Sequence, residues 1–145
     1  MYLNMSPKLI EPKVLMHIEQ FGIKETQPRW SYCQYLNALK GPQVKAVISD
    51  DENAFVIYLS YSKLKQAHVL QWAVKEKGKG LGLKFFIDFV KSLGDSEIFL
   101  ELRSDNLAAL SIYRKLAFEQ LRFKENYYSY PYQADALEMK RAVCN

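Results

Sequence analysis

Apolar residues recur with a helical period in the N-terminal part of the chain. Within residues 12–22 the apolar side chains stand three or four positions apart, which predicts an amphipathic helix that begins at the first-turn proline Pro12. A second helix is expected over residues 30–39, because the Gly41-Pro42 pair that follows would stop it. Residues 1–10 favour a short strand.

Runs rich in apolar and β-branched residues come next, over residues 44–49, 54–60 and 67–74. Short polar segments separate these runs, a pattern typical of antiparallel strands that follow one another in a meander. The last of these strands leads directly into a glycine-rich turn. We therefore expect a sheet whose third strand ends where that turn begins.

The segment Gln71–Val90 joins this strand to an apolar helix through the turn Lys75-Glu76-Lys77-Gly78-Lys79-Gly80-Leu81-Gly82-Leu83. Glycines allow a tight turn, and the N-terminus of the helix adds unpaired N–H groups and the positive end of a dipole. With the lysines, these groups favour binding of an anion, phosphate in particular. A turn of this kind is more often only a tight connection, and it matches neither the Walker loop nor the dinucleotide-binding fingerprint.

The C-terminal part of the chain predicts further strands and one helix. Residues 96–103 alternate as in a strand, and the preceding strand and crossover helix imply that this strand lies parallel to the one ending at Val74. Ser104-Asp105 would cap a helix over residues 106–116. Two final strands are expected at 118–124 and 134–141, separated by an aromatic loop over 126–132.

Size and composition favour a single domain over residues 1–145. The chain is 49% apolar and 14% aromatic, which is enough to build a core, and no apolar run is long enough to span a membrane. The N-terminus lacks the pattern of a signal peptide, and Cys33 and Cys144 are too few for a disulfide framework, so we expect a cytoplasmic protein. His17 and His68 are isolated, so we expect no metal.

The chain carries a formal net charge of +4, and its basic residues are spread along the sequence. Such an excess suits a polyanionic small molecule, for example a nucleotide or a coenzyme. Nucleic acid is the weaker interpretation, because the chain has no dense basic run.

The segment Leu100-Glu101-Leu102-Arg103-Ser104-Asp105-Asn106-Leu107-Ala108-Ala109, with Tyr113 and Leu116-Ala117-Phe118 after it, resembles the GNAT superfamily of acetyltransferases. With Asn126-Tyr127-Tyr128 added, the pattern is similar to the bacterial ribosomal-protein alanine N-acetyltransferases. The resemblance covers residues 71–140 well. Before them it depends on Ile18-Glu19-Gln20 and on Pro28-Arg29-Trp30-Ser31.

This resemblance implies the GNAT fold, an α/β arrangement with a mixed, mostly antiparallel central sheet. In that fold a parallel pair of strands splays around acetyl-CoA, and helices cover both faces. The family's pyrophosphate loop corresponds to Lys77-Gly78-Lys79-Gly80-Leu81-Gly82, followed by Leu83, although Lys77 departs from the usual first residue. Ala117 also departs from the usual glycine, and a left-handed conformation there would cost about 1 kcal/mol.

Acetyl transfer requires a neutral amine, support for an oxyanion and a proton for the departing thiolate. By the resemblance, Glu101 is the general base, acting through a water, and Tyr113, with an unperturbed pKa of about 10, is the general acid. The Val74 amide would hold the thioester oxygen. Trp72 and Ala73 would pair with the pantetheine arm, which Asn106 would also bind.

Each of these residues also has a simpler interpretation. A glutamate on a strand is most often a solvated surface residue, and a tyrosine in a helix is most often half-buried core. Trp30, Tyr127 and Tyr128 would line the acceptor groove, but aromatic loops also pack simply as lids.

The implied activity is acetyl transfer from acetyl-CoA to a protein N-terminus, an alanine of a small-subunit ribosomal protein. Direct transfer in a ternary complex is expected, because no cysteine lies in the motif. We expect neither a membrane nor direct nucleic acid as a partner. Because ribosomal proteins and this chain are both basic, long-range steering would not help them meet unless a local acidic patch offsets it. The alternatives are a GNAT enzyme for small amines or lysine side chains, and a non-catalytic acyl-CoA-binding module.

Overall fold

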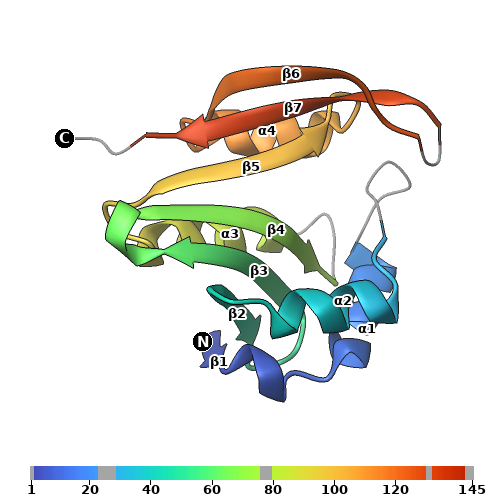
Figure 1. Ribbon diagram of the computed structural model, residues 1–145, viewed down its shortest axis with the longest axis vertical. Coiled ribbons are helices and arrows are strands. Elements are labelled where there is room, and N and C mark those ends of the chain that lie inside the picture. Colours follow the sequence, from blue (N-terminus) through green and yellow to red (C-terminus); the bar gives the residue numbers. More distant parts are fainter. Residues whose placement is uncertain (1, 23–28, 76–79, 130–131, 143–145) are drawn as a thin grey trace.

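A computed structural model describes residues 2–22, 29–75, 80–129 and 132–142 of the chain. The strands and helices follow one another along it (Figure 1) in this order: β1 Tyr2–Met5, α1 Pro12–Gly22, α2 Tyr32–Lys40, β2 Val44–Ser49, β3 Ala54–Tyr61, β4 Gln66–Val74, α3 Leu81–Ser92, β5 Glu97–Arg103, α4 Leu107–Lys115, β6 Glu119–Tyr128 and β7 Ala134–Arg141. Two short 3-10 helices, Pro7–Leu9 and Ser62–Leu64, complete the order.

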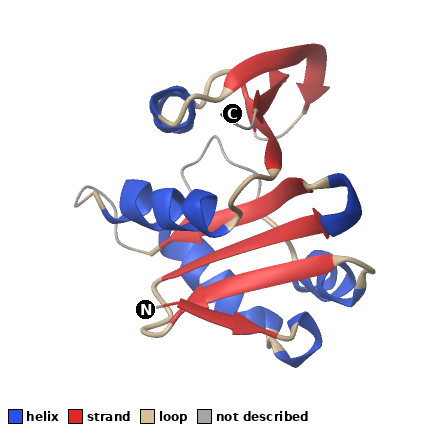
Figure 2. Cartoon of the chain, turned by 90° about the vertical axis from the view of Figure 1, so that its left-hand side faces the viewer, coloured by secondary structure: helices blue, strands red, loops and turns tan. Residues whose placement is uncertain are grey.

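The strands form one sheet in the order β1-β2-β3-β4-β5-β7-β6. Neighbouring strands are antiparallel except β4 and β5, which run parallel as the strand–helix–strand pattern predicted. Helices lie on both faces of this mixed sheet (Figure 2). The fold class expected from the resemblance is therefore confirmed.

The sheet separates two cores, because side chains alternate along its strands. One core lies against α3 and α4 and includes Val56 of β3, Phe86 of α3 and Leu110 of α4. The other lies against α1 and α2 and includes Phe55 of β3 and Tyr35 of α2. Since neighbouring residues of β3 enter opposite cores, both faces of that strand are buried.

The parallel pair β4–β5 separates soon after it begins. Its ladder joins only Gln66–His68 to Glu97–Phe99, although β4 continues to Val74 and β5 to Arg103. The register between β3 and β4 also shifts, which leaves Leu70 as an extra residue on β4. Such a bulge bends a strand and increases its twist. Figure 1 shows β5 diverging from β4 beyond the shared ladder.

Several predicted boundaries need correction. The second helix begins at Tyr32 rather than Trp30, because Ser31 and Gln34 form a reciprocal capping box before it. Asn106, not Ser104-Asp105, caps α4. The last hairpin is longer than expected, since β6 continues to Tyr128.

Ala117 adopts the left-handed conformation that glycine would favour, with φ of +66°. The residue follows Leu116, the C-cap of α4, and its amide donates to the Arg114 carbonyl. The turn therefore has the geometry expected of the family's glycine, and Ala117 is strained in it.

Candidate active site

The end of β4 presents its backbone to the side on which β5 diverges. The Lys75 amide donates to the Asn53 carbonyl at 2.6 Å. Because amides of an antiparallel strand point alternately to either side, the Val74 amide points away from β3, toward the side of β5. Ala73, in contrast, faces β3 with its amide and is paired in register with Phe55. This geometry suits the predicted role of Val74 as a donor to an oxyanion.

The N-terminus of α3 supplies further amides near this strand end. Gly80 is the N-cap and has φ of +72°, a left-handed conformation that explains the need for glycine. The first helical bond runs from the Lys84 amide to the Gly80 carbonyl, so the amides of Leu81, Gly82 and Leu83 precede the intrahelical ladder. The predicted residues Lys77, Gly78 and Lys79 lie outside the described residues.

Gly82 lies directly against the end of β4. A Cβ built at Gly82 would stand 3.7 Å from the Val74 side chain and 3.9 Å from Trp72, which is ordinary contact distance. The first turn of α3 and the last residues of β4 therefore meet.

Tyr113 is buried and joins α4 to β4. Its hydroxyl oxygen accepts a hydrogen bond from the Trp72 indole N–H at 2.8 Å. Because the indole is the donor, the Tyr113 proton is left to point elsewhere. Burial raises the pKa of Tyr113 to about 12, against the unperturbed value of about 10, so the hydroxyl stays protonated at neutral pH.

Asn106 has a structural role that the sequence analysis did not assign to it. Its side-chain oxygen accepts the Ala109 amide at 3.2 Å and so caps α4. The cap leaves the two side-chain N–H donors to serve any other partner. Asn106 therefore fixes the start of the helix that carries Tyr113.

Glu101 lies on the opposite face of β5 from Tyr113. Its strand neighbours Leu100 and Leu102 enter the core with Tyr113, while Glu101 points to the face that no described helix covers. There its carboxylate accepts a hydrogen bond from the Lys124 ammonium at 2.8 Å, and the Tyr128 hydroxyl lies 3.5 Å from its other oxygen. Glu101 stands two residues before Arg103, the last residue of β5.

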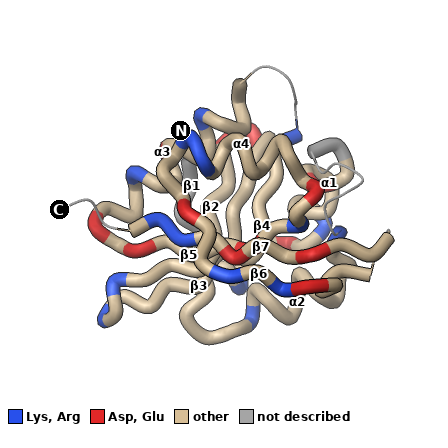
Figure 3. The backbone as a smooth tube through the Cα atoms, turned by 90° about the horizontal axis from the view of Figure 1, so that it is seen from above, with Lys and Arg blue, Asp and Glu red and all other residues tan. Residues whose placement is uncertain are grey.

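Acidic and basic positions are interspersed along β5, β6 and β7 (Figure 3). Glu101 stands opposite Glu138 in the β5–β7 register. These two carboxylates lie side by side on this face. Each is matched by its own cation, since Arg122 lies 3.8 Å from Glu138 and Lys124 bonds Glu101.

The predicted acceptor residues Tyr127 and Tyr128 belong to β6 rather than to a loop. The register with β7 shifts between Lys124 and Tyr128, and Asn126 has φ of +51° within this irregular stretch. Tyr128 lies beside Glu101, which together with burial raises the pKa of its hydroxyl. Tyr127 is exposed and packs edge-on against Tyr128 at 5.1 Å between ring centroids.

Arg103 is a central residue of this face whose role the sequence did not indicate. It is 2% exposed, forms two hydrogen bonds with Asp105 and donates to the Tyr132 carbonyl at 3.0 Å. Its guanidinium also stacks on the rings of Tyr128 and Tyr132, at 5.5 and 4.8 Å. Arg103 thus ties the end of β5 to the β6–β7 connection; its place in the Leu-Glu-Leu-Arg motif was the only signal.

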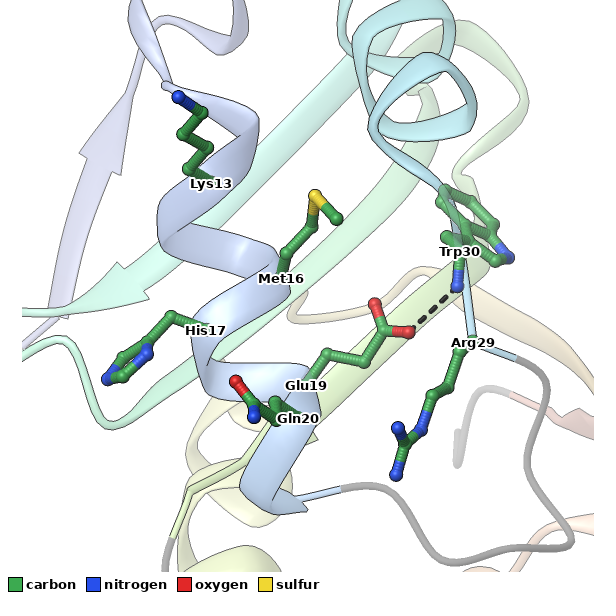
Figure 4. A pocket seen from close by; sticks show the side chains of 7 residues that line it. All are labelled: Lys13, Met16, His17, Glu19, Gln20, Arg29 and Trp30. Atoms are coloured by element: carbon green, nitrogen blue, oxygen red, sulfur yellow. Dashed lines mark hydrogen bonds between the residues drawn. The ribbon is translucent and has the colours of Figure 1, made fainter.

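Trp30 lines a pocket of about 420 Å³ between α1 and the segment before α2 (Figure 4). Its amide donates to Glu19 at 2.7 Å, and its ring packs on Tyr35 at 5.2 Å. Glu19 is 2% exposed, and Tyr35 also donates to it. Burial raises the pKa of this carboxyl. The structure therefore gives Trp30 a packing role beside Glu19, a residue that the sequence did not single out.

The structure brings Trp72, Val74, Gly82 and Tyr113 together at the end of β4, and Glu101 with Tyr128 on the open face of β5. Among the described residues, no group of three or more His, Cys, Asp and Glu side chains is arranged to hold a metal. None of the helices within residues 2–22, 29–75, 80–129 and 132–142 is long and apolar enough to cross a membrane.

Three curated proteins show the sequence relationships. The chain is 25% identical over 119 residues to the N-alpha-acetyltransferase RimI of Mycobacterium tuberculosis, covering 77% of this chain and 75% of that one. It is 22% identical over 138 residues to an N-alpha-acetyltransferase of Sulfurisphaera tokodaii, covering 84% and 83%. A third match, 30% over 76 residues, is to an uncharacterised protein of Mycobacterium leprae; it takes in 52% of this chain but about a fifth (21%) of that protein's length. No protein-family profile matches the chain.

Solved structures agree with these relationships. The ribosomal-protein-S18-alanine N-acetyltransferase of Escherichia coli superposes with a TM-score of 0.76 at 25% identity, covering 100% of this chain and 96% of the other. NAA60 of Arabidopsis thaliana, solved in complex with acetyl-CoA, superposes with a TM-score of 0.69 at 16% identity, covering 97% of each chain.

Proposed function

We propose that the chain is an acetyl-CoA-dependent N-acetyltransferase of the GNAT superfamily. We propose further that its acceptor is the N-terminal amine of a protein, an alanine of a small-subunit ribosomal protein in particular. The similarity to N-alpha-acetyltransferases from a bacterium and an archaeon supports the N-terminal acceptor. The similarity to the Escherichia coli enzyme for ribosomal protein S18 supports the alanine.

We propose that the strand end Trp72–Val74 binds the pantetheine arm as an added strand would, with Asn106 as a further partner. The Val74 amide would support the oxyanion that develops on the thioester carbonyl, since it points toward the side of β5. The amides of residues 80–83 at the start of α3, with Lys77, Gly78 and Lys79 before them, would receive the pyrophosphate.

Tyr113 is proposed as the general acid, and the hydrogen bond from Trp72 is the observation that carries this role. With the indole N–H fixing its oxygen at 2.8 Å, the hydroxyl donates rather than accepts at its remaining position. Its raised pKa of about 12 keeps the proton on the phenol until negative charge develops on the departing sulfur. The thiolate then leaves as the thiol.

Glu101 is proposed as the general base on the other side of β5. The acceptor reaches the enzyme as an ammonium, and a proton must leave its nitrogen before the lone pair attacks the thioester carbon. Glu101 would take that proton through a water. The C–N bond would form and the C–S bond would break. The nitrogen would then lose its second proton, which would return through water to the Tyr113 phenolate, and no covalent enzyme intermediate is needed. Tyr127, Tyr128 and Trp30 are proposed to border the acceptor.

The proposal is tested with a panel of peptides that begin with alanine, other small residues, or an N-acetylated alanine as the blocked control, incubated with enzyme and acetyl-CoA. Mass spectrometry should show one acetyl group on the free N-terminal amines and none on the blocked peptide. Acetylation confined to lysine side chains or to added small amines would contradict the N-terminal acceptor.

Two variants test the catalytic roles in the same assay. Tyr113→Phe should lower kcat by about 10²-fold, in the range of a lost general acid, while acetyl-CoA still protects the variant against thermal unfolding. Glu101→Gln should lower the rate with similar retention of acetyl-CoA binding. Unchanged turnover in both variants would remove these two residues from the mechanism.

A further inference from the structure

The contact between Lys124 and Glu101 places a cation of the protein on the carboxylate that is proposed to receive the acceptor amine. The Lys124 ammonium donates to Glu101 at 2.8 Å, with side chains that are 34% and 28% exposed. It also lies 4.8 Å from the centroid of the Tyr127 ring. A carboxylate and an aromatic face are the groups that bind a primary ammonium in proteins.

The position of Lys124 in the sheet explains how it reaches Glu101. Lys124 on β6 and Arg103 on β5 both pair in register with Ala136 of the intervening strand β7. The short side chain of Ala136 leaves the lysine stem room to cross β7 diagonally toward Glu101. The stem begins where the β6–β7 register becomes irregular, and it is long and unbranched, so it has other rotamers available.

The opposing carboxylates Glu101 and Glu138 would attract any ammonium that approaches this face. In the structure the Lys124 ammonium takes the place at Glu101, and the same contact raises its pKa, so it is charged at neutral pH. An acceptor α-ammonium has the same charge and the same donors. Two cations beside one carboxylate repel each other, so the acceptor competes with Lys124 for Glu101 whether it lies on the carboxylate itself or on the water proposed above.

We propose that Lys124 is a tethered competitor of the acceptor: its ammonium occupies Glu101 in the free enzyme, and the acceptor α-ammonium displaces it on binding. This inference rests on the proposed role of Glu101. It predicts that Lys124 weakens acceptor binding without taking part in the chemical step, and that it discriminates against acceptors lacking a cationic amine.

A series of variants at Lys124 tests this in steady-state kinetics with an alanine-starting peptide. Lys124→Met removes the cation and should lower KM for the peptide about two- to five-fold, the range expected of a partly exposed ion pair. Lys124→Arg should raise the same KM, because a guanidinium can hold a carboxylate through two hydrogen bonds. The values of kcat and of KM for acetyl-CoA should change less than about two-fold.

The chain offers a matched control. Lys140 forms an ion pair with Glu97 on the same face, with side chains that are 33% and 29% exposed, close to those of the Lys124 pair. Lys140→Met should leave KM for the peptide unchanged. A fall in KM of equal size in this variant would show a general charge effect and would overturn the proposal.

A second readout does not depend on turnover. In wild-type protein with labelled lysine and CoA, the Lys124 Nζ signal, assigned by its loss in Lys124→Met, should shift when the alanine-starting peptide is added. The N-acetylated peptide should leave it in place. Equal shifts with both peptides, or none with either, would overturn the displacement.

The outcomes separate the two proposals. If Lys124 only orients Glu101 for catalysis, Lys124→Met should lower kcat and Lys124→Arg should restore it, and tethered competition is then wrong. Unchanged KM across the series, with normal peptide turnover, overturns the Lys124 proposal alone. If the wild-type enzyme acetylates no peptide N-terminus, the proposed function fails first and the inference falls with it.

Discussion

The two parts of the sheet on either side of the β4–β5 junction differ in how they are covered. In the β1–β4 part, α1 and α2 pack on one face and α3 on the other, so β3 is buried from Ala54 to Tyr58. In the β5–β7–β6 part, the face that carries Glu101 has no described helix over it, and most of β6 is exposed. The first part holds the fold together. The second presents the charges and aromatic rings that an acceptor would meet.

This difference explains where strong and weak interactions lie. In the covered part, the Glu19 carboxylate is buried and hydrogen-bonded to the Trp30 amide and the Tyr35 hydroxyl. On the open face, the Glu101 carboxylate is partly exposed and ion-paired with Lys124. A half-exposed pair exchanges partners at small cost, whereas a buried hydrogen-bonded group does not. Under the proposed function, the open face must admit a charged acceptor, and partly exposed ion pairs suit that requirement.

The largest expected contrast compares two phenylalanines on strands. Phe55 of β3 is fully buried and Phe123 of β6 is 51% exposed. Phe55→Ala should lower the free energy of unfolding by about 3–5 kcal/mol, and Phe123→Ala by less than about 1 kcal/mol. Urea denaturation followed by circular dichroism measures both. Similar losses of unfolding free energy in the two variants would mean that the β5–β7–β6 part of the sheet is covered in solution.

A smaller effect concerns the carboxyl of Glu19. Burial raises the pKa of this group. A carboxyl that holds its proton more tightly when folded adds stability at low pH, and this contribution is lost as the pH rises through the folded pKa. Glu19→Gln cannot titrate. Its unfolding free energy relative to wild type should therefore increase as the pH rises from about 4.5 toward neutrality.

Asp95 provides the control of opposite sign. Its partner Lys65 lowers the pKa of the Asp95 carboxyl, so its contribution is lost as the pH falls. Asp95→Asn should therefore lose stability relative to wild type at neutral pH and approach it in acid. A pH-independent difference for Glu19→Gln in the same denaturation series would contradict the raised pKa.

The smallest expected effect is at Ala117, which joins α4 to the exposed β6. Replacing a left-handed alanine with glycine relieves strain of about 1 kcal/mol but adds freedom to the unfolded chain. Ala117→Gly should raise the unfolding free energy by about 0.5 kcal/mol, with unchanged kcat. Thermal unfolding measures the change. A loss of stability would show that the alanine methyl makes contacts that outweigh the strain.

The sequence predicted most of the fold because its local signals agree with the tertiary structure. The strands 44–49 and 134–141 and the helix 12–22 have the predicted bounds. Misplaced boundaries arose where side chains set the ends: Ser31 delays α2, and Asn106 takes the cap from Ser104-Asp105. β6 extends because pairing with β7 resumes at Tyr128 after an irregular stretch.

For the site, the sequence by itself determined which side chains are available and on which face of a strand each stands. Because side chains alternate along a strand, it placed Glu101 and Arg103 on one face of β5 and Leu102 on the other. Only the tertiary structure decided which distant residues meet: Trp72 with Tyr113, Lys124 with Glu101, and Glu19 with Trp30. Periodicity along a chain fixes direction within one element, whereas contacts between elements depend on sheet order, register and bulges, which many residues determine together.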